Sequence, residues 1–260
     1  MRLDLHSHST GSDGTETPSE LAARAAQRGL AIFALTDHDA VTPIEVAGTR
    51  TIRAVEISCD HAGKTIHLLA YDRGGAGWTD LEAKLGATRE ARKNRLRVMA
   101  AKLKARGVVI DVEPIITRAA DGRSVGRPDL ARAMVAQGAA TSLKDAFARH
   151  LYDNGPVDVP HRALSLHDAL ALGRAANAAM SLAHPHLYEP ALVRAHAGEG
   201  LGGIEAFYAG YDPGEREQWI ALADELELVC TGGADAHGPD DSIGVELPDD
   251  RASALLDWLT

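Results

Sequence analysis

Histidines and carboxylates recur along this chain at spacings that could place them around metal ions. His6 and His8 lie two positions apart near the start of the chain, and Asp235 and His237 have the same spacing near its end. Side chains two apart on a strand point to the same face, so such a pair can bind one ion. The full set of candidates is His6, His8, Asp13, His38, Glu56, His67, His184, Asp235 and His237.

Each candidate alone also has an ordinary structural explanation. The Thr-Asp-His-Asp string at residues 36–39 equally suits a turn that caps a helix. The proline after His184 can simply end a strand. A lone His-x-His pair is common by chance, but nine such groups distributed over six successive predicted strand ends favour one polar site over surface decoration.

Short apolar runs alternate with helical patterns and indicate the elements that would position these groups. Because strand–helix units repeat, the chain is predicted to be an α/β protein with a parallel sheet or barrel and outer helices. In such folds the functional residues gather at the carboxyl ends of the strands. The predicted strands are residues 1–8, 31–35, 52–57, 65–71, 179–183, 203–207 and 228–231. The predicted helices of these units are residues 18–29, 165–176, 213–227 and 252–259, with Thr17 and Ser165 as caps.

A different pattern occupies the middle of the chain. Residues 79–106 form a long, charged helical pattern, and residues 130–137 and 142–151 continue it without a strand signal of comparable strength. We therefore predict a barrel domain from residues 1–75 and 157–260, interrupted by a helical insertion at residues 76–156.

Composition limits the classes of protein that this chain can be. It has 27 Lys and Arg against 37 Asp and Glu, a net charge of -10, which argues against a non-specific polyanion binder. Two cysteines exclude a disulfide scaffold. The 12 histidines outnumber Trp, Tyr and Phe combined, which again draws attention to metal or acid–base chemistry. No signal-like or membrane-spanning apolar run is present, so we expect a cytoplasmic protein without a membrane partner.

The motifs that contain the candidates resemble the PHP (polymerase and histidinol phosphatase) family. The matching strings are DLHSHS at residues 4–9, SDG at 12–14, LTDHD at 35–39, VEIS at 55–58, IHLL at 66–69, AHP at 183–185 and DAH at 235–237. The resemblance implies a distorted (β/α)7 barrel with a helical insertion and a metal cluster at the carboxyl ends of its strands. Within the family, the chain is similar to the stand-alone metal-dependent phosphoesterases.

The resemblance also implies a grouping of the ligands around two or three divalent transition-metal ions. Ligand types alone do not choose among Mn, Fe and Zn. The implied groups are His6, His8, Glu56 and Asp235 for one metal, Glu56, His67 and His184 for a second, and Asp13, His38 and His237 for a third.

The implied reaction is hydrolysis of a small phosphomonoester, with a nucleotide as the expected substrate, by a metal-activated hydroxide. Arg127, just ahead of a predicted helix, is a candidate phosphate clamp because its planar fork suits phosphate. His161 is a candidate donor to the phosphate or to the leaving oxygen. A surface salt bridge and a solvated histidine explain these two residues equally well.

Two departures from the family pattern bear on the substrate. Relatives tend to carry Gly-Lys before the segment that matches residues 157–161 and Gly-Arg after the His-Pro pair, whereas this chain has residues 153–156 as DNGP and then His186-Leu187. The missing cations argue against a bisphosphate or an oligonucleotide. The alternatives are a 5′-3′ exonuclease on short RNA, a histidinol phosphate phosphatase, and a non-catalytic, metal-stabilised accessory module. The oligomeric state does not follow from the sequence.

Overall fold

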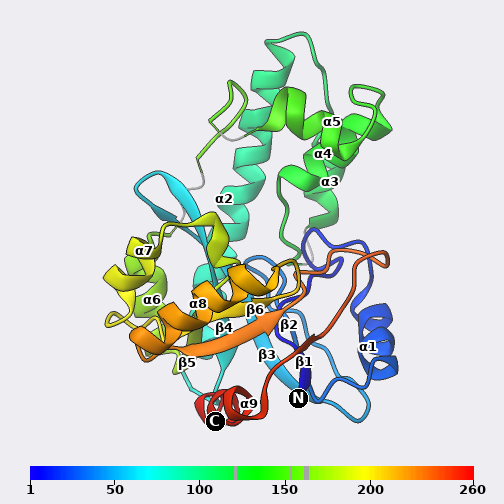
Figure 1. Cartoon of the computed structure of the whole chain (residues 1–260). Helices are drawn as coiled ribbons and strands as arrows, with labels where there is room; N and C mark the ends of the chain where they lie inside the picture. Colours follow the sequence, from blue (N-terminus) through cyan, green and yellow to red (C-terminus); the bar gives the residue numbers. More distant parts are fainter. Residues whose placement is uncertain (120–121, 153, 161–163) are drawn as a thin grey trace.

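The computed structural model describes residues 1–119, 122–152, 154–160 and 164–260. Its centre is one nearly closed, barrel-shaped sheet of eight strands with helices around it (Figure 1), which confirms the predicted α/β barrel. The strands follow the order β7-β6-β5-β4-β3-β2-β1-β8. They are β1 (Arg2–Asp4), β2 (Ile32–Leu35), β3 (Arg50–His61), β4 (Lys64–Asp72), β5 (Ala178–Leu182), β6 (Gly203–Tyr208), β7 (Val229–Gly233) and β8 (Val245–Glu246).

The barrel closes where the chain after β1 meets the end of β7. The amide of Leu5 donates to the carbonyl of Gly232 at 3.0 Å, and the amide of Asp235 donates to the carbonyl of His6 at 2.7 Å. A parallel bridge between Ser7 and Ala236 continues this seam. The predicted first strand is therefore too long, because β1 ends at Asp4 and the next residues bond to the segment after β7.

Two strands run against the predicted parallel arrangement: β4, which was predicted as a strand, and β8, which was not predicted and is antiparallel to β1. β4 is antiparallel to both β3 and β5, whereas β1–β2, β2–β3, β5–β6 and β6–β7 pair in parallel. Only Ala62 and Gly63 connect β3 to β4, and both have positive φ angles. A two-residue turn joins antiparallel strands, because a parallel crossover needs a dozen or more residues.

The helices begin where the sequence supplies capping groups. The side chain of Thr17 accepts a hydrogen bond from the amide of Glu20, and Ser165 does the same for Asp168, as predicted. The helices of the barrel are α1 (Pro18–Gln27), α6 (Leu166–Ala175), α7 (Pro190–His196), α8 (Pro213–Glu225) and α9 (Asp249–Trp258), with a 3-10 turn η3 (Pro185–Leu187). The remaining ones are α2 (Trp78–Lys104), α3 (Glu113–Arg118), α4 (Arg127–Ala136), α5 (Leu143–Ala146) and the π-helical turn η2 (Phe147–Leu151).

Two large hydrophobic cores divide the long helix α2 between them. Trp78 and Leu85 at its start pack in the barrel core. Leu96 and Leu103 further along pack in a second core formed by residues 96–157. Figure 1 shows α2 running from the barrel to the layer of α3, α4 and α5, on the side away from both termini. These cores support the proposed insertion at residues 76–156, although the change of core falls within α2. Within the described ranges, no helix is long and apolar enough to cross a membrane.

Candidate metal centre

His6 and His8 lie on the extended segment that closes the barrel, and both side chains are buried. Asp4 positions this segment, because its carboxylate accepts hydrogen bonds from the amides of His6, Ala234 and Gly244. Burial raises the pKa of Asp4 to about 6, against the opposing effect of these amide donors. The first candidate pair is thereby held against the chain segment that carries Asp235.

Glu56 is the residue that most of the candidate histidines share. It is fully buried in the middle of β3, so the prediction that it ends its strand is wrong. The strand continues past the site because it forms the hairpin with β4. The oxygens of Glu56 lie 2.8–3.5 Å from imidazole nitrogens of His6, His8, His38, His67 and His184.

Asp235 completes the group around the first two histidines. Its Oδ1 lies 3.3 Å from Nε2 of His6 and 3.1 Å from Nε2 of His8. On the other side of Glu56, Nδ1 of His67 lies 3.2 Å from Nε2 of His184. The structure thus brings together the members of the first two predicted ligand groups.

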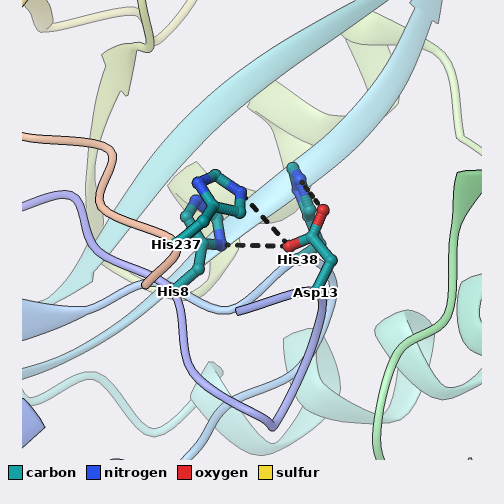
Figure 2. A group of neighbouring side chains, drawn as sticks. All are labelled: His8, Asp13, His38 and His237. Atoms are coloured by element: carbon teal, nitrogen blue, oxygen red, sulfur yellow. Dashed lines mark ion pairs between the residues drawn. The ribbon is translucent and has the colours of Figure 1, made fainter. Parts of the chain in front are cut away.

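The third predicted group gathers around Asp13, as Figure 2 shows. Asp13 Oδ1 lies 3.3 Å from Nε2 of His237, and Oδ2 lies 3.7 Å from Nε2 of His38. His8 joins this group as well, because its Nδ1 lies 3.8 Å from Asp13 and its ring stacks on that of His237 at 4.3 Å. His8 therefore lies between two of the three groups.

Backbone strain accompanies two of these positions. His184 has a φ angle of 30° and Asp235 has one of 54°, and residues other than glycine seldom adopt such values. Such conformations cost free energy and persist where the surrounding structure enforces them, which is common at functional sites. The amide of His184 is held by a carboxylate oxygen of Glu205 at 2.7 Å.

Glu205 is a site residue that the sequence analysis missed. It lies fully buried in β6, and Nδ1 of His6 lies 3.0 Å from its carboxylate. A carboxylate bound to Nδ1 fixes the tautomer of the ring and leaves Nε2 as the lone-pair donor facing the centre. The only signal in the sequence was an acidic residue inside an otherwise apolar strand.

Asp37 shapes the loop that carries Asp13, and its role was also missed. Its carboxylate accepts hydrogen bonds from the backbone and hydroxyl of Ser9 and from the hydroxyls of Ser12 and Thr42. Gly11 is required in this loop, since a Cβ there would lie 2.3 Å from Asp37 Oδ2. The loop geometry therefore depends on a buried carboxylate and on one glycine.

The electrostatics of the cluster favour bound cations. Burial disfavours a charged His8, but Asp235 and Glu56 outweigh burial and raise the pKa of His8 to about 10. Burial lowers the pKa of His67 to about 4, so that ring stays a neutral donor at physiological pH. Several buried atoms lack a partner with hydrogen-bond geometry among the described residues: His6 Nε2, His8 Nε2, His38 Nδ1, Glu56 Oε2 and His184 Nδ1.

Unpaired buried polar atoms are costly, and the residues that carry them belong to groups in which each residue offers one ligand atom within 4.8 Å of the others. Imidazole and carboxylate donors of this kind suit divalent transition-metal ions. The donor set therefore fits a group of divalent cations.

The two predicted catalytic residues have different outcomes. Arg127 begins α4 and is partly buried, with Nη1 donating to the carbonyl of Leu151 at 3.3 Å and the guanidinium over the ring of Phe147. The contacts that the structure gives for Arg127 thus face η2, on the side of the insertion. His161 lies outside the described residues.

Comparison with known proteins agrees with this geometry. A model of the PHP domain matches residues 4–115. The 3′,5′-nucleoside bisphosphate phosphatase of Chromobacterium violaceum is 30% identical over 91% of this chain and 87% of its own length. The 5′-3′ exoribonuclease Rnm of Escherichia coli is 30% identical over 91% and 85%. A solved structure from Bifidobacterium adolescentis, assigned as a metal-dependent phosphoesterase, is 28% identical with a TM-score of 0.82 and covers 98% of this chain and 96% of that one.

The barrel, the donor cluster and these relatives together define a metal-dependent phosphoesterase, a hydrolase of phosphoester bonds. The chain belongs to the PHP domain family, which confirms the resemblance seen in its motifs.

Proposed function

We propose that this protein hydrolyses a small phosphomonoester, with a nucleotide as the first candidate, at a centre of two or three Mn, Fe or Zn ions. The observation that carries the proposal is the gathering of nine imidazole and carboxylate side chains into adjoining groups, with Glu56 and Asp13 each contacting several of the histidines. These groups come from segments spread between residues 6 and 237, which the barrel brings to one place.

The proposed ligand groups keep their predicted membership. The distances support the first two groups, since each histidine proposed to share a metal with Glu56 lies within 3.5 Å of it. The groups are His6, His8, Glu56 and Asp235, then Glu56, His67 and His184, and finally Asp13, His38 and His237. When bound, divalent ions at these positions would lower the pKa of water and offset the charge of the phosphate.

Two residues that contact proposed ligands, without binding metal themselves, have a positioning role in this proposal. Glu205 orients His6, and the hydroxyl of Tyr208 donates to Oδ2 of Asp235 at 3.3 Å. Both contacts limit the rotation of a ligand side chain, which keeps the donor atoms directed at one point. The burial of His6, His8 and Glu56 excludes water from the far side of the cluster.

Arg127 remains our candidate for seating the phosphate, and His161 our candidate proton donor. The segment just before α4 is tied to the loop that carries Asp13, since the amide of Ser124 donates to the carbonyl of Gly11 at 2.9 Å. This hydrogen bond supports the proposal, because Ser124 lies only three residues before Arg127. A guanidinium there could form paired hydrogen bonds with a phosphate.

A 5′-3′ exonuclease acting on short RNA is the second candidate. It is favoured by the match to the Escherichia coli exoribonuclease Rnm, which is as extensive as the match to the bisphosphate phosphatase. Histidinol phosphate phosphatase and a non-catalytic accessory module have no comparable observation in their favour.

A substrate screen with the purified protein and added Mn tests this proposal. Phosphate release is measured from nucleoside monophosphates, nucleoside bisphosphates, sugar phosphates and 5′-phosphorylated short RNA. We expect release from at least one nucleotide by the wild type and none by His8→Ala, while the exposed control Arg149→Gln keeps the wild-type rate. A wild type that releases phosphate from no small ester would contradict the proposal.

A further inference from the structure

Three histidines outside the metal centre lie together with one glutamate at the edge of the barrel. His61 ends β3 at the tip of its hairpin with β4, and His167 lies in the first turn of α6. His196 ends α7, and Glu199 lies in the turn that follows it. Figure 1 shows α6 and α7 on the side of the barrel where the cyan β3–β4 hairpin projects. None of the proposed ligand groups includes these four residues.

The fold itself brings the hairpin tip to these helices. Asp60 and Ser165 form a parallel bridge, so His61 and His167 lie close to a backbone contact between β3 and the start of α6. His61 is five residues beyond Glu56 in β3, which places it about 16 Å further along the strand. The cluster is therefore separate from the metal centre.

Glu199 contacts two of the three imidazoles. Its Oε2 lies 2.8 Å from Nδ1 of His196 and 4.0 Å from Nδ1 of His167. The hydrogen bond with His196 lowers the pKa of Glu199, so its carboxylate is ionised at neutral pH. Ligand atoms of a tetrahedral zinc site lie about 3.3 Å apart, because each is about 2.0–2.1 Å from the ion. The two contacts bracket this value, and the side chain of His167, which is 71% exposed, can rotate to shorten the longer one.

The ring of His196 is held with one nitrogen directed at the cluster. Its side chain is only 13% exposed, and its Nε2 is buried without a hydrogen-bond partner among the residues that the structure describes. The ring of His61 lies perpendicular to it at 5.3 Å, close to the 5.2 Å between His67 and His184 in the second proposed metal group. A simple ion pair with a carboxylate needs one imidazole, whereas three imidazoles from three elements lie together here.

We propose that a divalent transition-metal ion of the Zn²⁺ type binds to His61, His167, His196 and Glu199, at a site separate from the metal centre. Imidazole and carboxylate are ligands that suit such an ion, and four of them complete the tetrahedral shell of a structural zinc site. The ion connects the β3–β4 hairpin to α6 and α7. Because the same hairpin carries Glu56, the ion stabilises strands that position the metal centre without taking part in hydrolysis.

The test counts the Zn²⁺ ions bound per chain by untagged protein. Since two of the ligands are exposed, the site exchanges its ion with the solvent and fills only in Zn²⁺-containing buffer. Wild type and variants are dialysed against buffered Zn²⁺, and the bound metal is measured by elemental analysis. We expect the wild type to bind one equivalent more than the double variant His61→Asn/His167→Asn, whose changes are at the surface, and one more than His196→Gln. The control His150→Gln, at a histidine of η2 outside the cluster, should bind the same number as the wild type.

Chemical modification locates the ion. Histidines of the wild type are carbethoxylated with diethyl pyrocarbonate, with and without Zn²⁺, and the peptides are analysed by mass spectrometry. We expect modification of His61 and His167 to slow about tenfold when free Zn²⁺ is about ten times its dissociation constant, because only the metal-free fraction reacts. Modification of His150 should not change.

Equal zinc contents of the wild type and the double variant would overturn the proposal, and so would equal modification of His61 and His167 with and without Zn²⁺. Neither measurement requires turnover, so a wild type that hydrolyses no phosphoester speaks against the proposed function alone.

Discussion

The end of the barrel and the insertion facing it carry opposite kinds of charged side chain. The barrel contributes imidazoles and carboxylates that are mostly buried, centred on Glu56 and Asp13. The insertion contributes guanidinium groups, several of which contact the same site loops. A guanidinium among the donors would repel divalent cations, and a carboxylate beside a phosphate would repel the substrate. The contrast fits the proposed function, in which the barrel would bind the metal ions and the insertion would bind the phosphate.

One buried arginine connects these two regions. Arg92 of α2 donates from Nε to Oδ2 of Asp39 at 2.6 Å, from Nη2 to the hydroxyl of Ser58 at 2.5 Å and from Nη1 to the carbonyl of Val125 at 3.3 Å. Asp39 follows His38, and Val125 lies two residues before Arg127. The contacts of Arg92 therefore hold the loop that follows His38 and the segment before α4 in one arrangement.

The largest expected effect comes from removing a ligand in the barrel. His8→Ala removes an imidazole between two of the proposed metal groups, and we expect phosphate release to fall by at least about 10³-fold. Elemental analysis of the same variant should show a loss of bound metal, with the far-UV circular dichroism of the wild type retained. A His8→Ala protein that remains active would contradict the proposal that the barrel binds the metal ions.

Removing the contacts of Arg92 that connect the two regions should lower the stability of the folded protein. Arg92→Met leaves the buried carboxylate of Asp39 without its cationic partner, and we expect a loss of about 3–5 kcal/mol in the free energy of unfolding. Urea denaturation measures this loss, and the matched surface change Arg149→Met should stay within about 0.5 kcal/mol. A loss for Arg92→Met no greater than that of the control would show that the two regions are held together by other contacts.

A smaller effect is expected at Glu205, which contacts a proposed ligand side chain and would not bind metal itself. Glu205→Gln keeps the size of the side chain but removes the charge that orients His6, so metal affinity should fall about 10–100-fold. Competition with a chromophoric chelator measures this affinity. Unchanged metal affinity would remove Glu205 from the positioning role assigned to it.

The smallest effect is expected in the insertion. Arg127→Ala should raise KM or lower kcat by about tenfold, because one guanidinium is removed while the metals stay in place. Metal content must equal that of the wild type for this result to count. A variant that loses metal together with activity would contradict the separation of metal and phosphate binding between the two regions.

Much of the barrel and of the proposed centre could be predicted from the sequence, because the information is local. His6 and His8 stand in a recognisable motif, and Thr17 and Ser165 cap the predicted helices. The reversal of β4 was also accessible, since the residues between the predicted strands 52–57 and 65–71 are too few for a parallel crossover.

Other features could not be predicted because they depend on tertiary contacts. Glu205 gains its role only when β6 brings it to His6, and no spacing in the sequence signals this pairing. Arg118 and Arg132 meet at one cavity only after α3 and α4 fold against the loop after Asp13. Arg92 belongs to the long, charged helical pattern of residues 79–106, and nothing in that pattern signals that the structure buries it against Asp39.

The central claim is that the barrel end holds several metal ions, and metal stoichiometry tests it most directly. Elemental analysis of the purified wild-type protein, against protein concentration from amino-acid analysis, is expected to give two or three equivalents of Mn, Fe or Zn per chain. Chelation should remove this metal together with phosphate release, and Mn should restore both. A correctly folded, active protein with less than one equivalent of metal would contradict the account.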